Sequence, residues 1–245
     1  MSLPVVPPRY ASWREMVAPL KKGASGWAAY AVQRVVGVTA DGVWGPMTDK
    51  AVYAWQSSHR DEYDRWLVVD GVVGPTTQYA MLLAVAISVD RTTTAIPDGV
   101  LKGMVTYEGA RLLAATNWYT PPGGTPGADC GAAQWRQYGP PFSMSGLLAA
   151  FDPKVALQQV ASRLSGRITN YKARRPSLTD QRALELAVLA HNAPFLAEQV
   201  VRNGRLSTPD AEAVWTTKAD GSHYTHAEWS VEYPSRILSY TKGIE

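Results

Sequence analysis

The sequence predicts a mainly α-helical protein in two parts: a small N-terminal three-helix bundle, then a larger helical domain with only a small sheet. Apolar residues recur at helical spacing in most of the long segments. A turn motif occurs twice near the N-terminus, each time with a proline placed to begin a helix. Proline and glycine cluster most densely within residues 117–127, which are predicted to form a loop.

Composition narrows the possible classes of protein. The chain has 245 residues, of which 46% are hydrophobic and 18% charged, as in globular proteins. A net charge of +3 without a Lys/Arg-rich run argues against a nucleic-acid partner. We expect no transmembrane helix, because no run of about 18 apolar residues occurs, and no signal peptide, because the start lacks a charged region. Cys130 is the single cysteine, which excludes an intrachain disulfide; a small half-buried packing role is expected for it.

The repeated turn is the clearest internal signal. Residues 41–48 read Asp-Gly-Val-Trp-Gly-Pro-Met-Thr and residues 70–77 read Asp-Gly-Val-Val-Gly-Pro-Thr-Thr, so six of eight positions match. Asp-Gly favours a tight turn because glycine accepts a positive φ angle. Helices are expected upstream of the first turn, over Trp27–Val36, and after each proline.

Three tryptophans of this region have predicted roles. Trp55 is expected in the core, because it lies at helical spacing from Ala51 and Val52. Trp44 and Trp66 are candidates for ligand contacts, although the apolar turn position of Trp44 favours the core. The polar insert Ser57–Arg65 is expected to be a solvated loop, with a role in shaping a binding groove as the alternative.

Residues 88–96 are polar and Thr-rich and are predicted to be a linker. The first module therefore spans residues 1–87, with its core at about 20–86, and the second domain spans residues 97–245. In the second domain Asp152 and Thr179 are expected as helix N-caps, and any sheet is expected around residues 128–138. The predicted helices are Pro97–Ala115, Pro153–Tyr171, Asp180–His191, Pro194–Asn203 and Ser230–Thr241.

Glu108 is the best candidate for a catalytic residue. It lies in Val-Thr-Tyr-Glu-Gly, residues 105–109, near the end of an apolar helix. Apolar surroundings disfavour a charged carboxylate, and a carboxyl that keeps its proton suits the acid of a glycosidase. Taken alone, a glutamate on a helix is usually a solvated surface residue. Three segments downstream strengthen the hypothesis: residues 129–135 (Asp-Cys-Gly-Ala-Ala-Gln-Trp), 151–156 (Phe-Asp-Pro-Lys-Val-Ala) and 190–194 (Ala-His-Asn-Ala-Pro).

These motifs carry two resemblances. The doubled turn, over about Leu20 to Ala86, resembles the peptidoglycan-binding family with paired DG-x-x-GP-x-T turns. From Ile96 to the C-terminus, the ordered motifs resemble soluble lytic transglycosylases and goose-type lysozymes, with Glu108 on their E-S motif. The other segments match G-L-M-Q, f-D-P-x-x-N and A-Y-N-A-G. Gly109 replaces the serine, Ala132-Ala133 replaces Leu-Met, and His191 replaces the tyrosine, so the roles of that serine and tyrosine are not carried over.

The resemblance implies a phage endolysin-like wall enzyme with a lysozyme-like catalytic domain. Glu108 would protonate the oxygen between N-acetylmuramic acid and N-acetylglucosamine. Asn192 is expected to touch the sugar or to cap the next helix, and His191 is expected to bond the substrate or Glu108, or to be a satisfied buried histidine. The substrate-binding residues expected from the motifs are Tyr107, Gly131, Gln134, His191 and Asn192.

Two outcomes of the cleavage remain open. The muramoyl 6-hydroxyl can attack and give a 1,6-anhydro end, which needs only Glu108, or water can attack, which normally needs a second carboxylate. Asp129 is the best second carboxylate, but a turn residue is the alternative for it, so the lytic transglycosylase is preferred over the muramidase.

Two other classes stay open. A wall-directed zinc peptidase would need three or four ligands, and His223 and His226 near Glu228 are the nearest candidates. A non-catalytic wall-binding structural protein would fit the departures from the motifs. We expect no cofactor or metal, a monomer, and peptidoglycan as the partner without membrane insertion. The protein is expected to stay in the host cytoplasm until a separate holin-like protein permits release, with an exported enzyme or a tail-borne lysin as the alternatives.

Overall fold

A computed structural model describes residues 3–9, 13–92, 96–107, 111–119, 127–139, 141–218 and 221–241. These residues are mainly helical with two small sheets, which confirms the predicted fold class. The helices are α1 (Trp13–Met16), α2 (Trp27–Val36), α3 (Pro46–Ser58), α4 (Pro75–Asp90), α5 (Val100–Tyr107), α6 (Met144–Phe151), α7 (Pro153–Arg174), α8 (Asp180–Asn192), α9 (Pro194–Asn203), α10 (Thr208–Glu212), α11 (His226–Leu238) and the 3-10 helix η1 (Ser239–Thr241). The strands are β1 (Thr116–Tyr119), β2 (Gly127–Cys130), β3 (Trp135–Tyr138), β4 (Val214–Thr217) and β5 (His223–Thr225). No helix in these ranges is long and apolar enough to cross a membrane.

The chain forms two compact units. The first contains residues 1–92 and 104–159, and the second contains residues 93–103 and 160–245. Helix α4 continues to Asp90, so the first residues of the predicted linker are helical. The predicted division into segments 1–87 and 97–245 stays a prediction.

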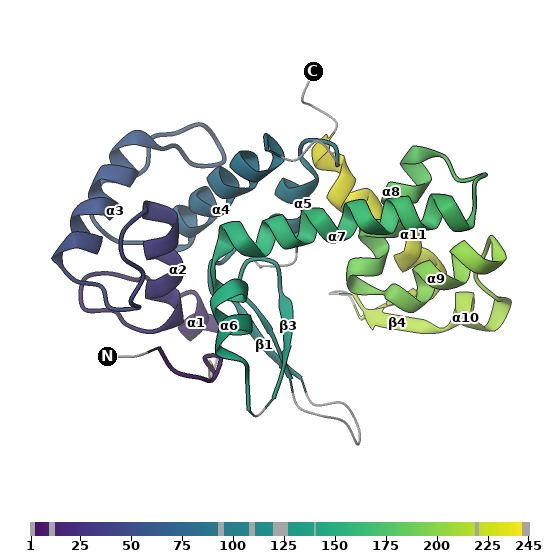
Figure 1. Cartoon of the computed structure of the whole chain (residues 1–245), viewed down its shortest axis with the longest axis horizontal. Helices are drawn as coiled ribbons and strands as arrows, with labels where there is room; N and C mark the ends of the chain where they lie inside the picture. The colour runs from purple at the N-terminus through teal and green to yellow at the C-terminus, as the bar shows by residue number, and fades with distance from the viewer. Residues whose placement is uncertain are drawn as a thin grey trace. The chain divides into compact units, whose positions relative to one another are not determined.

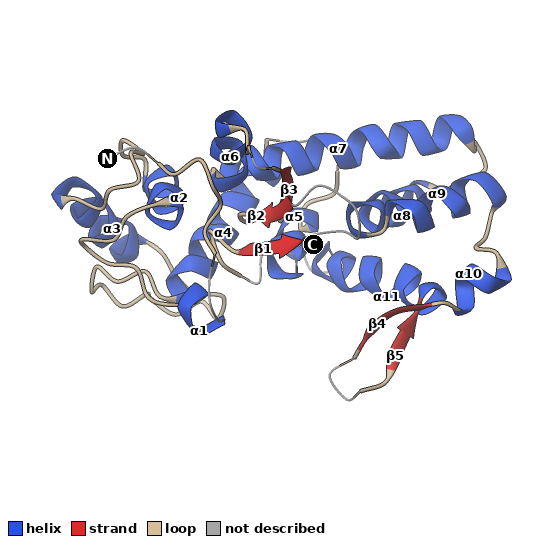
Figure 2. Ribbon diagram, turned by 90° about the horizontal axis from the view of Figure 1, so that it is seen from below, coloured by secondary structure: helices blue, strands red, loops and turns tan. Residues whose placement is uncertain are grey.

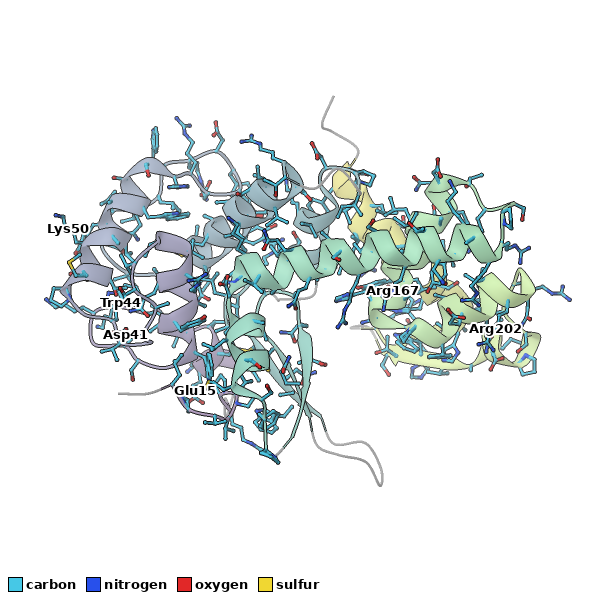
Figure 3. The ribbon with its side chains drawn as sticks, viewed as in Figure 1. Glu15, Asp41, Trp44, Lys50, Arg167 and Arg202 are labelled. Atoms are coloured by element: carbon cyan, nitrogen blue, oxygen red, sulfur yellow. The ribbon has the colours of Figure 1, made fainter. Side chains whose placement is uncertain are left out.

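A buried glutamine holds each repeated turn of the first unit. Gln33 donates to the Asp41 carboxylate at 2.8 Å and to the Val43 carbonyl at 3.0 Å, while its own oxygen accepts from Gly42 N at 2.8 Å. Asp41 also accepts from Val43 N at 2.8 Å, and these hydrogen bonds lower the pKa of the Asp41 carboxyl. Asp41 and Trp44 lie at the turn that joins α2 to α3 (Figure 3).

The second turn repeats this arrangement atom for atom. Gln56 donates to Asp70 Oδ1 at 3.0 Å and to Val72 O at 3.0 Å, and it accepts from Gly71 N at 2.9 Å. Gln33 and Gln56 are each 1% exposed, at the same place near the end of the helix that precedes the turn. The doubled motif is therefore a structural repeat, in which the Asp-Gly pair and the buried glutamine form one clamp.

The helices of the bundle begin as the sequence predicts. Gly45 and Gly74 precede Pro46 and Pro75, which occupy the first turns of α3 and α4. The prediction for Trp55 is wrong: its side chain is only half-buried and stacks on His59, with ring centroids 3.9 Å apart. The bundle is visible in Figure 1 as α2, α3 and α4.

The three-stranded sheet has the order β1-β2-β3 and is antiparallel throughout. Strand β3 falls within the predicted range 128–138 and β2 begins one residue before it, but β1 forms at Thr116–Tyr119, largely where a loop was predicted. The predicted helix Pro97–Ala115 is also wrong in extent, because α5 spans only Val100–Tyr107 and residues 111–115 are turns. Strand β1 depends on its pairing with β2, which no local pattern reveals.

Helix α6, which the sequence analysis did not predict, joins the bundle to the sheet within the first unit. Trp27 of α2 stacks on Phe151 of α6 at a centroid distance of 4.8 Å. One apolar core contains both rings together with further residues from α2, from the sheet and its flanks, and from α6 and the segment before it: Tyr30, Ala114, Ala128, Cys130, Phe142, Leu147 and Ala150. The interpretation of Cys130 as a packing residue is thus confirmed, although it is wholly buried rather than half-buried.

The second unit is built on α8, α9 and α11, with the β4–β5 hairpin beside α10 and α11 (Figure 2). Thr179 caps α8 by accepting from Arg182 N, as predicted. The predicted last helix begins too late: α11 starts at His226, where Thr225 and Glu228 form a capping box. The hairpin was not predicted.

Candidate functional site

Glu108, the predicted acid, lies outside the described residues, as do Gly109 and Ala110. The chain on both sides of it is tied to helix α4. Before it, Thr106 Oγ1 lies 2.7 Å from the Tyr79 hydroxyl. After it, Leu113 N donates to Gln78 Oε1 at 3.1 Å. The bundle therefore fixes both flanks of the segment that carries the predicted acid.

Arg111 is a third anchor, with an unusual backbone. Its φ angle is +65°, a left-handed conformation that non-glycine residues adopt at a cost. Its guanidinium forms an ion pair with Glu62 at 3.0 Å and lies over the Tyr79 ring, 4.6 Å from the centroid. These contacts, all within the first unit, offset the backbone strain. Tyr107, a predicted substrate residue, is 43% exposed at the end of α5.

The β2–β3 hairpin brings together Asp129, Gly131 and Gln134. Gly131 has φ +71°, which favours glycine, and a Cβ there would also clash with the Ala150 carbonyl oxygen of α6. Gln134 donates its side-chain amide to Ala115 O at 3.2 Å and to Gly131 O at 3.0 Å. Both interactions shape the hairpin, and the sequence analysis had predicted a sugar contact for Gln134 instead.

Asp129 lies within strand β2, so its interpretation as a turn residue is wrong. In the register of the sheet it stands between Asn117 and Arg136. It is half-buried, whereas Ala128 and Cys130 on either side are fully buried. Burial, with a smaller contribution from the Asp129 charge, raises the pKa of the Cys130 thiol to about 12. Cys130 is therefore a protonated packing group at neutral pH and not a nucleophile.

His191 and Asn192 belong to the second unit, at the end of α8. Asn192 is exposed, and its Oδ1 accepts from Trp229 Nε1 at 3.2 Å. It does not cap the next helix, because Ala193 holds that position. His191 is half-buried.

Aromatic side chains gather next to Asn192. Trp215 of β4 lies over Trp229 of α11, with ring centroids 6.2 Å apart and ring planes inclined by 21°. Phe195, which follows the His-Asn motif and is 45% exposed, contacts both Trp215 and His226. We call Phe195, Trp215, His226 and Trp229 the aromatic cluster.

The sequence analysis missed the aromatic cluster, since its members come from a helix start, a short hairpin and the last helix. The high tryptophan content was the only sequence signal for it. The rings are partly exposed and border a polar amide, a combination suited to an amphipathic ligand. Nδ1 of His226 is buried without a hydrogen-bond partner among the described residues.

A desolvated cation lies in the same unit. Burial lowers the pKa of Arg167 on α7, with the phenols of Tyr171 and Tyr233 opposing this shift. Its guanidinium reaches the Ala187 carbonyl at 3.5 Å, and it forms no ion pair within the described ranges. Figure 3 labels this residue on α7.

The two tryptophans that were candidates for ligand contacts differ in exposure. Trp44 is 2% exposed, so its indole has no free face for a ligand, and its proposed role in wall binding is withdrawn. Trp66 is 62% exposed and borders a groove of about 410 Å³ that also includes Asp61, Arg65 and Thr76.

The residues of the zinc alternative have other partners. His223 Nδ1 lies 3.1 Å from Thr217 Oγ1, His226 packs in the aromatic cluster, and Glu228 caps α11. Among the residues that the structure describes, no group of three or more His, Cys, Asp or Glu side chains is arranged to hold a metal ion.

Neither a scan against models of known protein families nor a search of curated proteins gives a match for this chain.

Proposed function

We propose that this chain is a peptidoglycan-degrading enzyme that cuts the bond between N-acetylmuramic acid and N-acetylglucosamine, with Glu108 as the acid. The observation that carries the proposal is the aromatic cluster beside Asn192, at the motif that resembles A-Y-N-A-G. Phe195, Trp215 and Trp229 offer ring surface, and Asn192 offers an amide next to it. N-acetylated sugars present matching C–H faces and amides.

The repeated turns support a wall-binding role for the bundle. Both Asp-Gly turns are clamped by a buried glutamine, so the motif shared with the peptidoglycan-binding family is used structurally in both copies. The bundle also holds both flanks of the Glu108 segment through Tyr79 and Gln78.

The proposed reaction needs one carboxyl. Glu108 donates its proton to the glycosidic oxygen as the C1–O bond breaks, and an oxocarbenium-like centre forms at C1 of the muramoyl residue. The 6-hydroxyl of the same residue then bonds to C1 and gives its proton to the Glu108 carboxylate. The products are a 1,6-anhydro end and a free 4-hydroxyl, and the acid is regenerated.

A muramidase is the second candidate, with water as the nucleophile and Asp129 as the second carboxylate. The half-buried position of Asp129 on the sheet leaves part of the residue accessible, which keeps this candidate open. The two reactions differ in their products and in their dependence on Asp129.

Mass spectrometry of the fragments released from purified sacculi tests the proposal. The native protein should release glycan fragments with anhydro-muramoyl ends, Glu108→Gln should release none, and Asp129→Asn should remain active. Reducing muramic ends that disappear in Asp129→Asn would establish the muramidase. Released stem peptides, or full activity in Glu108→Gln, would show that the proposed reaction is wrong.

We also propose an endolysin-type role for the enzyme. The protein would collect in the host cytoplasm and reach the wall after a separate membrane-permeabilising protein acts. Expression in the cytoplasm should leave cells intact until their membrane is permeabilised chemically, and lysis without permeabilisation would contradict this route.

A further inference from the structure

The insert between the two repeated turns is an ordered loop. The Asp61 carboxylate accepts from Tyr63 N at 2.9 Å, from Arg65 N at 3.0 Å and from Arg65 Nε at 2.8 Å. Its side chain is only 6% exposed, so the carboxylate lies inside the loop. Such a loop is organised before any ligand arrives, which lowers the entropic cost of binding to it.

This ordered loop and the residues directly after it display apolar groups to solvent. Tyr63 is 68% exposed, Trp66 62% and Val68 72%. The Arg60 guanidinium lies over the Trp66 ring at 4.1 Å from its centroid and so orients the indole. The groove of about 410 Å³ runs along Trp66, with Arg65 and Thr76 on its walls.

A second hollow adjoins this groove. It has a volume of about 250 Å³ and shares Pro75 and Thr76, in the first turn of α4, with the first groove. Its other walls include Glu62 of the insert and Arg111, which are joined by their ion pair. The insert therefore borders both hollows, and the second one reaches the residue that stands three positions after Glu108 in the sequence.

We propose that the two hollows form one groove that binds an amino-sugar strand of peptidoglycan, in addition to the aromatic cluster of the other unit. The inference rests on the proposed function for its choice of ligand. A pyranose ring can place its C–H face on the Trp66 indole, while the exposed Thr76 hydroxyl is available to sugar hydroxyls and amides. The charges on the walls of the groove are paired, Arg65 with Asp61 and Arg111 with Glu62, so these walls offer donors and acceptors to a neutral, hydroxyl-rich sugar.

Binding to purified sacculi tests the groove, with the full-length Glu108→Gln protein as the parent so that the wall is not consumed. Trp66→Ala should weaken binding at least tenfold, and Trp66→Phe should retain part of the affinity. Thr76→Tyr, which fills the place where the hollows meet, should also weaken binding. Met47→Ala is the matched control: Met47 is 72% exposed, occupies the position equivalent to Thr76 in the first repeat, and borders neither hollow.

Calorimetry with soluble probes identifies the ligand. Peptide-free glycan strands should bind the parent and lose affinity in Thr76→Tyr. Binding of free stem peptides alone would overturn the proposal, as would Trp66-dependent dimerisation in the ultracentrifuge. Unchanged sacculus binding in both Trp66→Ala and Thr76→Tyr would overturn it as well, and if Trp66→Ala does not fold, Thr76→Tyr decides.

The groove and the enzymatic reaction can fail separately. Binding that depends on Trp66, without release of glycan fragments by the native protein, would reject the enzyme and retain the groove. Release of fragments by the native protein, without binding that depends on Trp66 or Thr76, would reject the groove and retain the enzyme.

Discussion

Arg34 Nε lies 2.6 Å from Asp152 Oδ2, so an ion pair joins helix α2 to the start of helix α7 across 118 residues of sequence. The Asp152 side chain is 5% exposed, and its other oxygen accepts from Lys154 N at 3.0 Å and Val155 N at 3.2 Å. One buried carboxylate is thus both the predicted N-cap of α7 and the partner of a bundle residue.

Asp152→Ala should lower the free energy of unfolding by about 3 kcal/mol, because it removes a helix cap and leaves Arg34 without its partner. Arg34→Ala should cost less, since the cap remains, and the double variant should be little worse than Asp152→Ala. Urea unfolding measures all three. Arg202→Ala, at an ion pair of 3.6 Å whose arginine is 71% exposed, is the control and should cost at most about 0.5 kcal/mol. Additive effects of Arg34→Ala and Asp152→Ala would contradict the coupling.

Because the two glutamine clamps are alike, removing either glutamine should lower the stability of the protein by a similar amount. Gln33→Ala and Gln56→Ala each leave a buried backbone N–H, of Gly42 and Gly71 respectively, without its acceptor. Each should cost roughly 2–4 kcal/mol, from the unsatisfied groups and the cavity together. Thermal unfolding of both variants checks this, with Gln181→Ala at an exposed hydrogen bond as the control. If either variant loses no more stability than the control Gln181→Ala, its clamp does not stabilise the turn.

Glu198 should make the stability of the second unit depend on pH. Its carboxylate accepts two hydrogen bonds from Arg174, both 2.9 Å long, and these lower its pKa from the ordinary 4.5. A lowered pKa in the folded state means that the stabilisation is complete above the unfolded value and is lost as pH falls through the folded value. At neutral pH, Glu198→Gln should cost at most about 1 kcal/mol, since the pair is partly exposed. This difference should shrink as the pH falls below about 4.5 and vanish below the folded pKa, and a difference that persists there would reject the ion pair as its cause.

Replacing two helical glycines by alanine should change the stability of the protein in opposite directions. A Cβ on Gly103 of α5 would lie 2.3 Å from the Ile237 carbonyl oxygen, whereas a Cβ on Gly166 of α7 would have no neighbour within 4 Å. Gly103→Ala should therefore destabilise the protein by about 2 kcal/mol or more. Gly166→Ala should stabilise it by up to about 1 kcal/mol, since alanine favours helix. Melting temperatures would show this, and a tolerated Gly103→Ala would exclude the close approach of α5 to Ile237.

Cys130 should resist thiol reagents in the folded protein. Its side chain is wholly buried, its thiol lies 3.4 Å from the Ala128 carbonyl oxygen, and its pKa is raised to about 12. At pH 8 the folded protein should react at least a hundredfold more slowly than the protein in denaturant, because the thiolate is the reactive form. Labelling followed by mass spectrometry measures this, and equal rates would mean that the sheet opens freely.

Local signals predicted much of the fold. The Asp-Gly turns, the prolines at Pro46 and Pro75 and the Thr179 cap act over a few residues, so the sequence is sufficient to locate them. Contacts between residues far apart in the sequence could not be predicted from local patterns. Apolar residues continue past Tyr107, yet the chain is non-helical from Arg111, which is held by Glu62 and Tyr79, residues distant from it in the sequence.

The candidate site was predictable only in part. The motifs identified Asn192 and the β2–β3 hairpin, but the structure uses Gly131 to accommodate α6 and Gln134 to hold its own turn. Trp215 and Trp229 could not be assigned to a site from sequence, because a hairpin and a helix bring them together only after folding. Trp66 illustrates a third case, because the polar insert directly before it, predicted to be solvated, forms part of the wall of the groove that Trp66 borders.

The stack of Trp27 on Phe151 bears on how this protein can be recombined with others. An excised N-terminal cassette ending at residue 92 would lack Phe151 and Asp152, so the Trp27 indole would lose its covering ring and Arg34 its counter-ion. Such a fragment would expose part of what is now a shared interior and would tend to associate through it. Transferring the bundle to another protein therefore requires residues 104–159 to be transferred with it.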